Sequence, residues 1–335
     1  MLPCEPWQTE EAGLNIGSVF GLVAEDLSRL EAALEDVANV DHPLFADLLR
    51  HILRGKGKRL RPAIGFLVTR MLNGDAERAL PLAVSVELLH TATLVHDDLV
   101  DNSFVRRGNP TLNAIASQGV TVLVGDYMFA ASADYANRCR DLDVMDVVAK
   151  TVMTICYGEL RQIFNAGDLR QNVEEYYRQI ESKTASLFAA SSECAAILGG
   201  VSPAARANLR DYGHNLGMAF QVADDILDFV GDEKTLGKPV GSDLRQGTIT
   251  LPALYAMQSA PVGQRLKSLL EGAGDRDANI NLAVQMIRQS SAIDQSYQTA
   301  AGFAAKARAN LAEFADSPYR DALLALADYA VSRER

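Results

Sequence analysis

The sequence predicts an all-α protein, because helical periodicity runs through nearly every segment and strand patterns are almost absent. Hydrophobic residues make up 48% of the 335 residues, which is ample for a large buried core. Apolar side chains recur at three- and four-residue spacing, the period of a helix with one buried face. We therefore expect a single-domain bundle of roughly ten or more helices over residues 1–335.

The elements follow from this periodicity in chain order. Apolar residues spaced from Ile16 to Leu34 predict a first long amphipathic helix. Pro62 suits the first position of a helix that runs to about Leu72, where Asn73-Gly74 provides a left-handed stop. Helical patterns then return at 77–101, 119–138, 143–167, 173–199 and 204–230.

Four segments predict loops, since they gather glycine, proline and charged residues: Arg106–Pro110, Gly231–Gly247, Ser259–Gly263 and Glu271–Asp277. The last two separate shorter helices near the carboxyl end. None has the length or composition of an interdomain linker, which favours one domain.

Charge and cysteine usage restrict the class of protein. The net charge of -11 argues against general nucleic-acid binding, which needs a basic face. Cys4, Cys139, Cys156 and Cys194 are widely separated, as expected of reduced thiols. The first fifteen residues lack the basic and apolar regions of a targeting signal, and no apolar stretch approaches a membrane span of about 18 residues. We expect a soluble, cytoplasmic protein.

Two Asp-Asp-x-x-Asp motifs each interrupt a strongly apolar helical pattern. In a helix, the first and last carboxylates of such a motif share a face, and the second is rotated by about 100° from the first. The carboxylates can converge on one small volume, where they repel one another unless a cation intervenes. The motifs are Asp97-Asp98-x-x-Asp101 and Asp224-Asp225-x-x-Asp228.

One such motif alone is more often a solvated acidic helix end. Two copies within apolar helices favour metal binding, because buried carboxylates need partners. Mg²⁺ suits these motifs better than Ca²⁺ or Zn²⁺, since it takes few protein carboxylates and fills its shell with water and substrate phosphate.

Basic residues gather at two places in this acidic chain, and a lone histidine lies near the first acidic motif. Residues 55–62, Gly-Lys-Gly-Lys-Arg-Leu-Arg-Pro, hold four cations before a helix start, where Lys58 and Arg61 can donate to an anion. A surface patch or a contact with anionic lipid is the alternative interpretation of this segment. Arg106-Arg107 follows Asp101 closely enough to reach back over metal-bound phosphate. His90 lies about two helical turns before Asp97, on the same face.

These sites predict an enzyme that binds two phosphorylated substrates with apolar bodies. Two substrates are indicated by the presence of two acidic motifs and at least two basic sets. The apolar faces beside the aspartates imply a hydrophobic pocket. A P-loop nucleotide enzyme is disfavoured by the absence of its glycine-rich motif. Isoprenoid diphosphates combine these properties.

With these residues in place, the chain resembles the trans-isoprenyl diphosphate synthases, or polyprenyl synthetases, over about residues 14–335. The resemblance implies an isoprenoid synthase-like helical fold around a central prenyl-chain cavity. The matching segments are Gly-Lys-Arg-Leu-Arg-Pro at 57–62, Glu-Leu-Leu-His through Asp101 at 87–101, Arg-Arg-Gly-Asn-Pro-Thr at 106–111, Gly-Asp-Tyr at 125–127, Lys-Thr at 183–184, Phe-Gln-Val-Ala-Asp-Asp-Ile-Leu-Asp at 220–228, and Gly-Asp-Glu-Lys-Thr-Leu-Gly-Lys-Pro at 231–239.

The resemblance implies a role for each matched residue. The isopentenyl diphosphate would be bound by Lys58, Arg61, His90 and Arg107, and the allylic diphosphate by Arg106, Lys183 and Lys238. The six aspartates would hold three Mg²⁺ ions, with Asp97, Asp98, Asp101 and Asp224 among the catalytic residues. Lys183, Thr184 and Gln221 would complete the catalytic set, with the Thr184 and Gln221 oxygens near the carbocation.

One position departs from the family pattern. Many relatives carry Lys where this chain has Thr248, so a diphosphate contact of the late loop is either missing or supplied by Arg245.

The family also suggests a product length. The residue five before the first acidic motif commonly gates chain length, and here it is Ala92. A methyl group would leave the tunnel open past Leu89, Leu88 and Ser85, with Phe129 or Ala133 as the facing wall. Because one helical turn of about 5.4 Å matches about one isoprene unit, we expect a long product of about C30–C50 for a quinone side chain. Ordinary close helix packing is the alternative explanation for Ala92.

Three other functions remain open at this stage. A shorter-chain synthase making farnesyl or geranylgeranyl diphosphate would need a floor residue on another helix. A related cyclase is disfavoured by the second acidic motif. A non-catalytic subunit of a heteromeric synthase is disfavoured because the aspartates and basic residues are intact. The family further implies a homodimer and transient membrane contact for product release.

Overall fold

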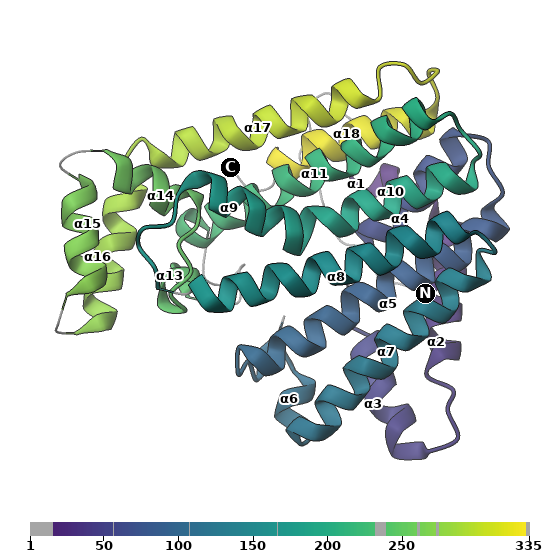
Figure 1. Ribbon diagram of the computed structural model, residues 1–335, viewed down its shortest axis with the longest axis horizontal. Coiled ribbons are helices and arrows are strands. Elements are labelled where there is room, and N and C mark those ends of the chain that lie inside the picture. Colours follow the sequence, from purple (N-terminus) through teal and green to yellow (C-terminus); the bar gives the residue numbers. More distant parts are fainter. Residues whose placement is uncertain are drawn as a thin grey trace. The chain divides into compact units, whose positions relative to one another are not determined.

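Helices account for nearly all regular structure in the computed structural model of the chain (Figure 1). The structure describes residues 16–55, 57–106, 108–165, 167–231, 239–259, 262–272 and 275–332. The helices are α1 Ile16–Gly21, α2 Ala24–Val37, α3 Pro43–Leu53, α4 Leu60–Met71, α5 Ala76–Val100, α6 Leu112–Ile115, α7 Gln118–Arg138, α8 Leu142–Asn165, α9 Val173–Ile180, η1 Glu181–Ala185, α10 Ser186–Leu198, α11 Pro203–Val230, α13 Ser242–Arg245, α14 Leu251–Gln258, α15 Val262–Glu271, α16 Arg276–Arg288, α17 Ala292–Asn310 and α18 Pro318–Ser332. The expected all-α class is confirmed.

Most predicted helix boundaries lie within one or two residues of the observed ones. The first helix is the exception, because a turn at residues 22–23 divides it into α1 and α2. Val23 donates to the carbonyl of Phe20 there, and α1 ends at Gly21, a poor helix former. The prediction of one continuous helix from Ile16 to Leu34 is therefore wrong.

The predicted stop after α4 forms as a left-handed cap. Asn73 has a φ of 53°, and the amide of Gly74 donates to the carbonyl of Thr69 at 2.8 Å. The Asn73 amide donates to the carbonyl of Arg70 at 3.1 Å. This pair of bonds satisfies carbonyls that the helix end would otherwise leave open.

The chain divides into two compact units. The first comprises Met1–Val152, Leu187–Gly213 and Leu311–Leu326, and the second comprises Met153–Ser186, His214–Asn310 and Ala327–Arg335. The expectation of one polyprenyl synthetase domain over the whole chain stays a prediction.

The first unit is built around α5, which packs along α7 on one side and against α4 on another (Figure 1). Nearly every residue of α5 from Leu82 to Leu89 is buried, and so is most of α4. By length and mean hydropathy α5 could also span a membrane, but 67% of its most apolar window is buried inside the protein, as in a core helix.

The second unit has a separate core, to which α9 and the carboxyl-terminal half of α11 contribute buried side chains. Its largest fully buried side chains are Tyr176 of α9 and Phe229 of α11. Apolar residues of α14, α15, α16 and α17 complete this core, with α15 and α16 packed as neighbours (Figure 1). Each unit therefore holds its own aspartate motif on a helix anchored in its own core.

Candidate active site

The first aspartate motif lies at the carboxyl end of α5. Asp97 is half-buried, Asp98 is buried and Asp101 is exposed just beyond the last helical residue. Asn102 follows with a φ of 49°, and the amide of Ser103 donates to the carbonyl of Asp98 at 2.8 Å. This left-handed cap ends the helix and fixes where Asp101 lies.

A short hairpin then returns Arg106 to the motif. Strand β1, Val105–Arg106, pairs antiparallel with β2, Asn109–Pro110, through a turn with Gly108 at a φ of 78°. Arg106 Nε donates to Asp98 Oδ1 at 2.8 Å. The hairpin thus brings Arg106 to the acidic motif, and its role toward a metal-bound phosphate stays a prediction. Arg107 lies outside the described residues.

Burial raises the pKa of Asp98, and the adjacent Arg106 guanidinium offsets part of that rise. The carboxylate is therefore held by a protein cation, whereas Asp97 and Asp101 are more accessible to solvent. The three carboxylates of this motif are not equivalent.

The basic segment before α4 brings Arg61 and His90 together. Arg61 Nη1 lies 3.2 Å from His90 Nε2, and its guanidinium sits 4.5 Å from the centre of the Phe188 ring. Ser191 Oγ donates to the carbonyl of Arg61 at 2.7 Å. Two residues that were predicted to bind the same diphosphate thus lie within hydrogen-bonding distance. Lys58 is exposed nearby in sequence, and Lys56 lies outside the described residues.

Arg59 of the same segment plays a different role. It has a left-handed φ of 46°, and its guanidinium donates to Glu31 at 2.7 Å, to buried Glu87 at 2.5 Å and to the carbonyl of Leu53 at 2.9 Å. These bonds tie the segment to α2, α3 and α5. Arg59 is therefore an anchor of the segment, a role that its sequence neighbours gave no means to predict.

The second aspartate motif lies near the carboxyl end of α11. Asp225 is buried and accepts hydrogen bonds from the Tyr176 hydroxyl at 2.7 Å and from Gln221 Nε2 at 2.8 Å. Thr184 Oγ1 donates to Gln221 Oε1 at 2.7 Å. The structure thus links Thr184, Gln221 and Asp225 in one chain of hydrogen bonds, with Tyr176 as an unpredicted member.

Burial and the neighbouring Asp243 raise the pKa of Asp225 well above its usual value, although the bonds from Tyr176 and Gln221 oppose that rise. Asp228 is also buried and accepts from Ser242 Oγ at 3.1 Å and from the amide of Asp243 at 3.2 Å. Asp224 is half-buried. Of this motif, Asp224 is the residue most accessible to a bound ion.

Lys183 and Thr184 lie in η1, a π-helical turn between α9 and α10. Such turns widen a helix locally and often mark functional sites. Lys183 Nζ lies 2.6 Å from Glu159 Oε1 of α8. Lys238 lies outside the described residues, and Thr248 is half-buried with its amide donating to the carbonyl of Asp243 at 2.9 Å.

Within the described residues, no three acidic, histidine or cysteine side chains form a ready-made metal cluster. Asp97, Asp101 and Asp224 are half-buried or exposed, so these carboxylates are the ones that could reach a divalent cation and leave room on it for water or substrate oxygens.

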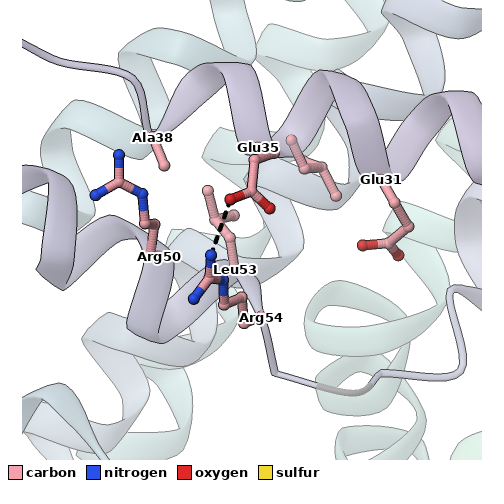
Figure 2. A pocket seen from close by; sticks show the side chains of 7 residues that line it. Glu31, Glu35, Ala38, Arg50, Leu53 and Arg54 are labelled. Atoms are coloured by element: carbon pink, nitrogen blue, oxygen red, sulfur yellow. Dashed lines mark hydrogen bonds and ion pairs between the residues drawn. The ribbon is translucent and has the colours of Figure 1, made fainter.

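Two cavities lie away from these residues. One of about 30 Å³, room for about one water, lies between α2 and α3. Glu35 pairs there with Arg54 at 3.0 Å, whereas Glu31 lies nearer the amino end of α2 (Figure 2). The second unit has one of about 550 Å³, lined among others by Leu244, Leu269 and Arg276. Neither cavity is lined by a predicted site residue.

Comparisons with known proteins identify the family of the chain. Residues 42–287 match the Polyprenyl synthetase family. The chain belongs to this family. It is 37% identical to the octaprenyl diphosphate synthase of Escherichia coli, over 96% of this chain and 100% of that one. The chain is a prenyltransferase, and its relatives use isoprenyl diphosphates.

Solved structures of the family show the same fold. A polyprenyl synthase from Caulobacter crescentus, complexed with calcium and isoprenyl diphosphate, matches at 37% identity and a TM-score of 0.89, over 97% of this chain and 99% of that one. A decaprenyl diphosphate synthase from Rhodobacter capsulatus matches at 34% identity and the same TM-score, over 96% and 99%. This polyprenyl synthetase therefore has the isoprenoid synthase fold.

Ala92, the predicted gate of chain length, lies in the buried part of α5. Ala92 is fully buried on α5, and so are Leu88, Leu89 and Ser85 below it. Phe129 is half-buried with its ring 5.3 Å from that of His96. Ala133 is exposed, so of the two residues considered for the facing wall Phe129 is the better placed.

Proposed function

We propose that this polyprenyl synthetase is a Mg²⁺-dependent trans-polyprenyl diphosphate synthase that condenses isopentenyl diphosphate with an allylic diphosphate. The observation that carries the proposal is the end of α5, where Asp97 and Asp101 flank a buried Asp98 whose oxygen accepts from Arg106. Carboxylates and guanidinium side by side suit a metal-bound diphosphate, whose oxygens take both kinds of partner.

Mg²⁺, with three ions as the family number, would be held by the aspartates and would neutralise charge on the leaving diphosphate. Arg106, Lys183 and Lys238 would hold the allylic diphosphate while its C–O bond breaks. The oxygens of Thr184 and Gln221 would face the resulting carbocation with their dipoles, without forming a bond to it. The hydrogen bond from Thr184 to Gln221 keeps these two groups together.

Lys58, Arg61, His90 and Arg107 would orient isopentenyl diphosphate so that its double bond attacks the carbocation. The electron pair of the double bond forms the new C–C bond after the allylic C–O bond has broken, and the cation that results would lose a proton to the released diphosphate. The product is again an allylic diphosphate and can enter another cycle. The contact between Arg61 and His90 supports a shared role in this binding.

We propose a long product of about C30–C50, used for a quinone side chain, because Ala92 carries a methyl group where a larger side chain would block the tail. Ala92→Tyr is then expected to shorten the product. Unchanged product length in that variant would reject Ala92 as the gate.

A shorter product is the second candidate, and one contact favours it. Ser85 Oγ lies 3.1 Å from Ser132 Oγ, and Ser132 also donates to the carbonyl of Ser85 at 2.8 Å. This contact joins α5 and α7 seven residues before Ala92 on α5, or about 10 Å along the helix axis. That distance is the length of about two isoprene units. A floor at this level would stop elongation early.

We also propose a cytoplasmic homodimer that contacts the membrane transiently to release its apolar product. Exposed apolar side chains on α7 and α8 support contact with a second copy or with a membrane, since a monomeric soluble protein rarely exposes so many large apolar side chains together. The family to which the chain belongs is the basis for expecting two copies.

The deciding experiment is incubation with isopentenyl and farnesyl diphosphates, with and without Mg²⁺, followed by chromatography of the dephosphorylated products. Elongation that requires Mg²⁺ is expected, and the longest product decides between the two lengths. Absence of any elongation would reject the proposed reaction.

A further inference from the structure

The ammonium group of Lys183 already has a carboxylate partner. Its Nζ lies 2.6 Å from Glu159 Oε1 on α8 and 3.5 Å from Gln162 Oε1, one turn further along the same helix. The side chains of Lys183 and Glu159 are 30% and 22% exposed. Oε1 of Glu159 is buried and, within the described residues, makes no hydrogen bond of good geometry. The lysine charge is therefore what compensates the burial of this oxygen.

The backbone is arranged to allow this approach. A Cβ at Gly158 would fall 2.6 Å from Ser182 Cβ and 3.5 Å from the amide nitrogen of Lys183. Only a residue without a side chain fits there without displacing η1 from α8. Gln162 is held in turn by Gln179 Nε2, which donates to its oxygen at 2.9 Å. The chain thus places Glu159 and Gln162 beneath the lysine.

A purely structural role explains the pair poorly. The adjacent ion pair of Arg161 and Glu175 already ties α8 to α9, and a partly exposed pair adds little to stability. The lysine, by contrast, is assigned to the allylic diphosphate, a ligand that must share or displace the carboxylate. We propose that Glu159 is the counter-ion of Lys183 in the unliganded enzyme and competes with diphosphate for its ammonium group.

This inference rests on the proposed function, in which Lys183 binds diphosphate. Glu159 acts as a positioning residue, since it reaches the substrate through Lys183. Removing its charge but keeping its shape, in Glu159→Gln, is expected to tighten diphosphate binding about two- to fivefold, the range of a partly exposed ion pair. A residue that merely supports the fold would weaken binding when replaced.

The test is calorimetric titration of the full chain with inorganic pyrophosphate in the presence of Mg²⁺. Glu159→Gln is expected to bind more tightly and Lys183→Ala more weakly, and Glu159→Gln added to Lys183→Ala is expected to change nothing further. Glu175→Gln is the matched control, because it removes a carboxylate that pairs with Arg161 and should leave the affinity unchanged.

Weaker or unchanged binding in Glu159→Gln overturns the inference, and so does an equal gain in the Lys183→Ala background. If the wild-type chain still elongates farnesyl diphosphate, the proposed function stands despite that failure. A wild-type chain without condensation activity would overturn both.

Discussion

Asp224 and Asp228 belong to one motif but have different surroundings. Asp224 is half-buried, whereas Asp228 is 1% exposed and holds the start of α13 through Ser242 and the amide of Asp243. Asp224→Asn should therefore reduce activity at least about tenfold and raise the Mg²⁺ requirement, with little change in stability. Asp228→Asn should instead cost about 1–3 kcal/mol of unfolding free energy, because the amide nitrogen that replaces one of the two accepting oxygens would then face a donor.

Urea denaturation without Mg²⁺ and activity measured against Mg²⁺ concentration separate these two effects. If Asp228→Asn keeps full stability and loses Mg²⁺ affinity, the distinction between ligand and loop anchor is wrong.

Tyr176→Phe tests the buried hydrogen bond to Asp225. The Tyr176 hydroxyl opposes the rise in the pKa of Asp225, so its loss should raise that pKa further. We expect the free energy of unfolding to fall by about 1–3 kcal/mol, because a buried carboxyl oxygen of Asp225 loses a hydrogen-bond donor. The Tyr177→Phe variant is a control, since Tyr177 bonds Tyr255 and not the motif.

The pH dependence has a definite sign. The pKa of Asp225 is raised in the folded protein, so the native state keeps this proton to higher pH than the unfolded chain does. The contribution of Asp225 to stability is therefore greatest below its unfolded value of 3.8 and falls as the pH rises toward the folded value. The penalty of Tyr176→Phe should shrink toward low pH in denaturation curves measured without Mg²⁺. An equal penalty at all pH values would contradict an ionised acceptor.

At the level of elements, periodicity predicted the helices because each buries one face against a core. It missed the break at residues 22–23, since the apolar spacing continues through that turn. It also missed the π-helical turn at Lys183, because a single widened turn does not alter the pattern enough. Local geometry of this kind depends on neighbours such as Gly158 that are distant in sequence.

The site residues show the same limit. The aspartates and cations were recognisable by type and spacing, but spacing does not tell which carboxylate is buried. Asp98 accepts a hydrogen bond from Arg106 of the hairpin, and Asp225 accepts one from Tyr176 of α9. Arg59 stands in the same basic segment as Arg61, and it is an anchor because Glu31 and Glu87 accept hydrogen bonds from its guanidinium.

Arg59 gives a prediction about the whole basic segment. Arg59→Ala removes bonds to α2, α3 and α5 and leaves Glu87 buried without this partner, so it should destabilise the protein by about 3–5 kcal/mol. It should also raise the KM for isopentenyl diphosphate more than it lowers kcat, since the segment also presents Arg61.

Arg59→Gly should be less destabilised than Arg59→Ala by about 1–2 kcal/mol, because glycine adopts the φ of 46° without strain. Arg54→Ala is the surface control, since its pair with Glu35 is 67% and 53% exposed. Equal KM values for isopentenyl diphosphate in all variants would refute the anchoring role.

At the level of the whole molecule, α8 carries an unusual exposed apolar stripe. Met153, Tyr157, Leu160 and Phe164 recur at alternating four- and three-residue spacing, and they are 47–78% exposed together with Ile163. This is the spacing with which one helix packs along another. In the proposed homodimer, a second copy of the chain would cover this stripe.

If the proposed homodimer forms through this stripe, Leu160→Glu should convert it to a monomer, because a charge in an apolar interface lacks a partner. Light scattering after size-exclusion chromatography measures the mass, and Leu44→Glu is the control, since Leu44 is 71% exposed on α3 of the first unit. A mass that is the same for Leu160→Glu and the wild type would reject α8 as the interface.

Cys156 provides an independent measure of the same interface. It is exposed on α8 near Leu160, whereas Cys139 and Cys194 are buried. Burial raises the pKa of Cys139 to about 11, so about one thiol in a thousand is ionised at pH 8. In a Cys4→Ser background, a thiol reagent should thus modify Cys156 slowly in the dimer and rapidly in Leu160→Glu. Equal rates would show that Cys156 remains accessible in the assembled enzyme and would place the contact between copies elsewhere on the chain.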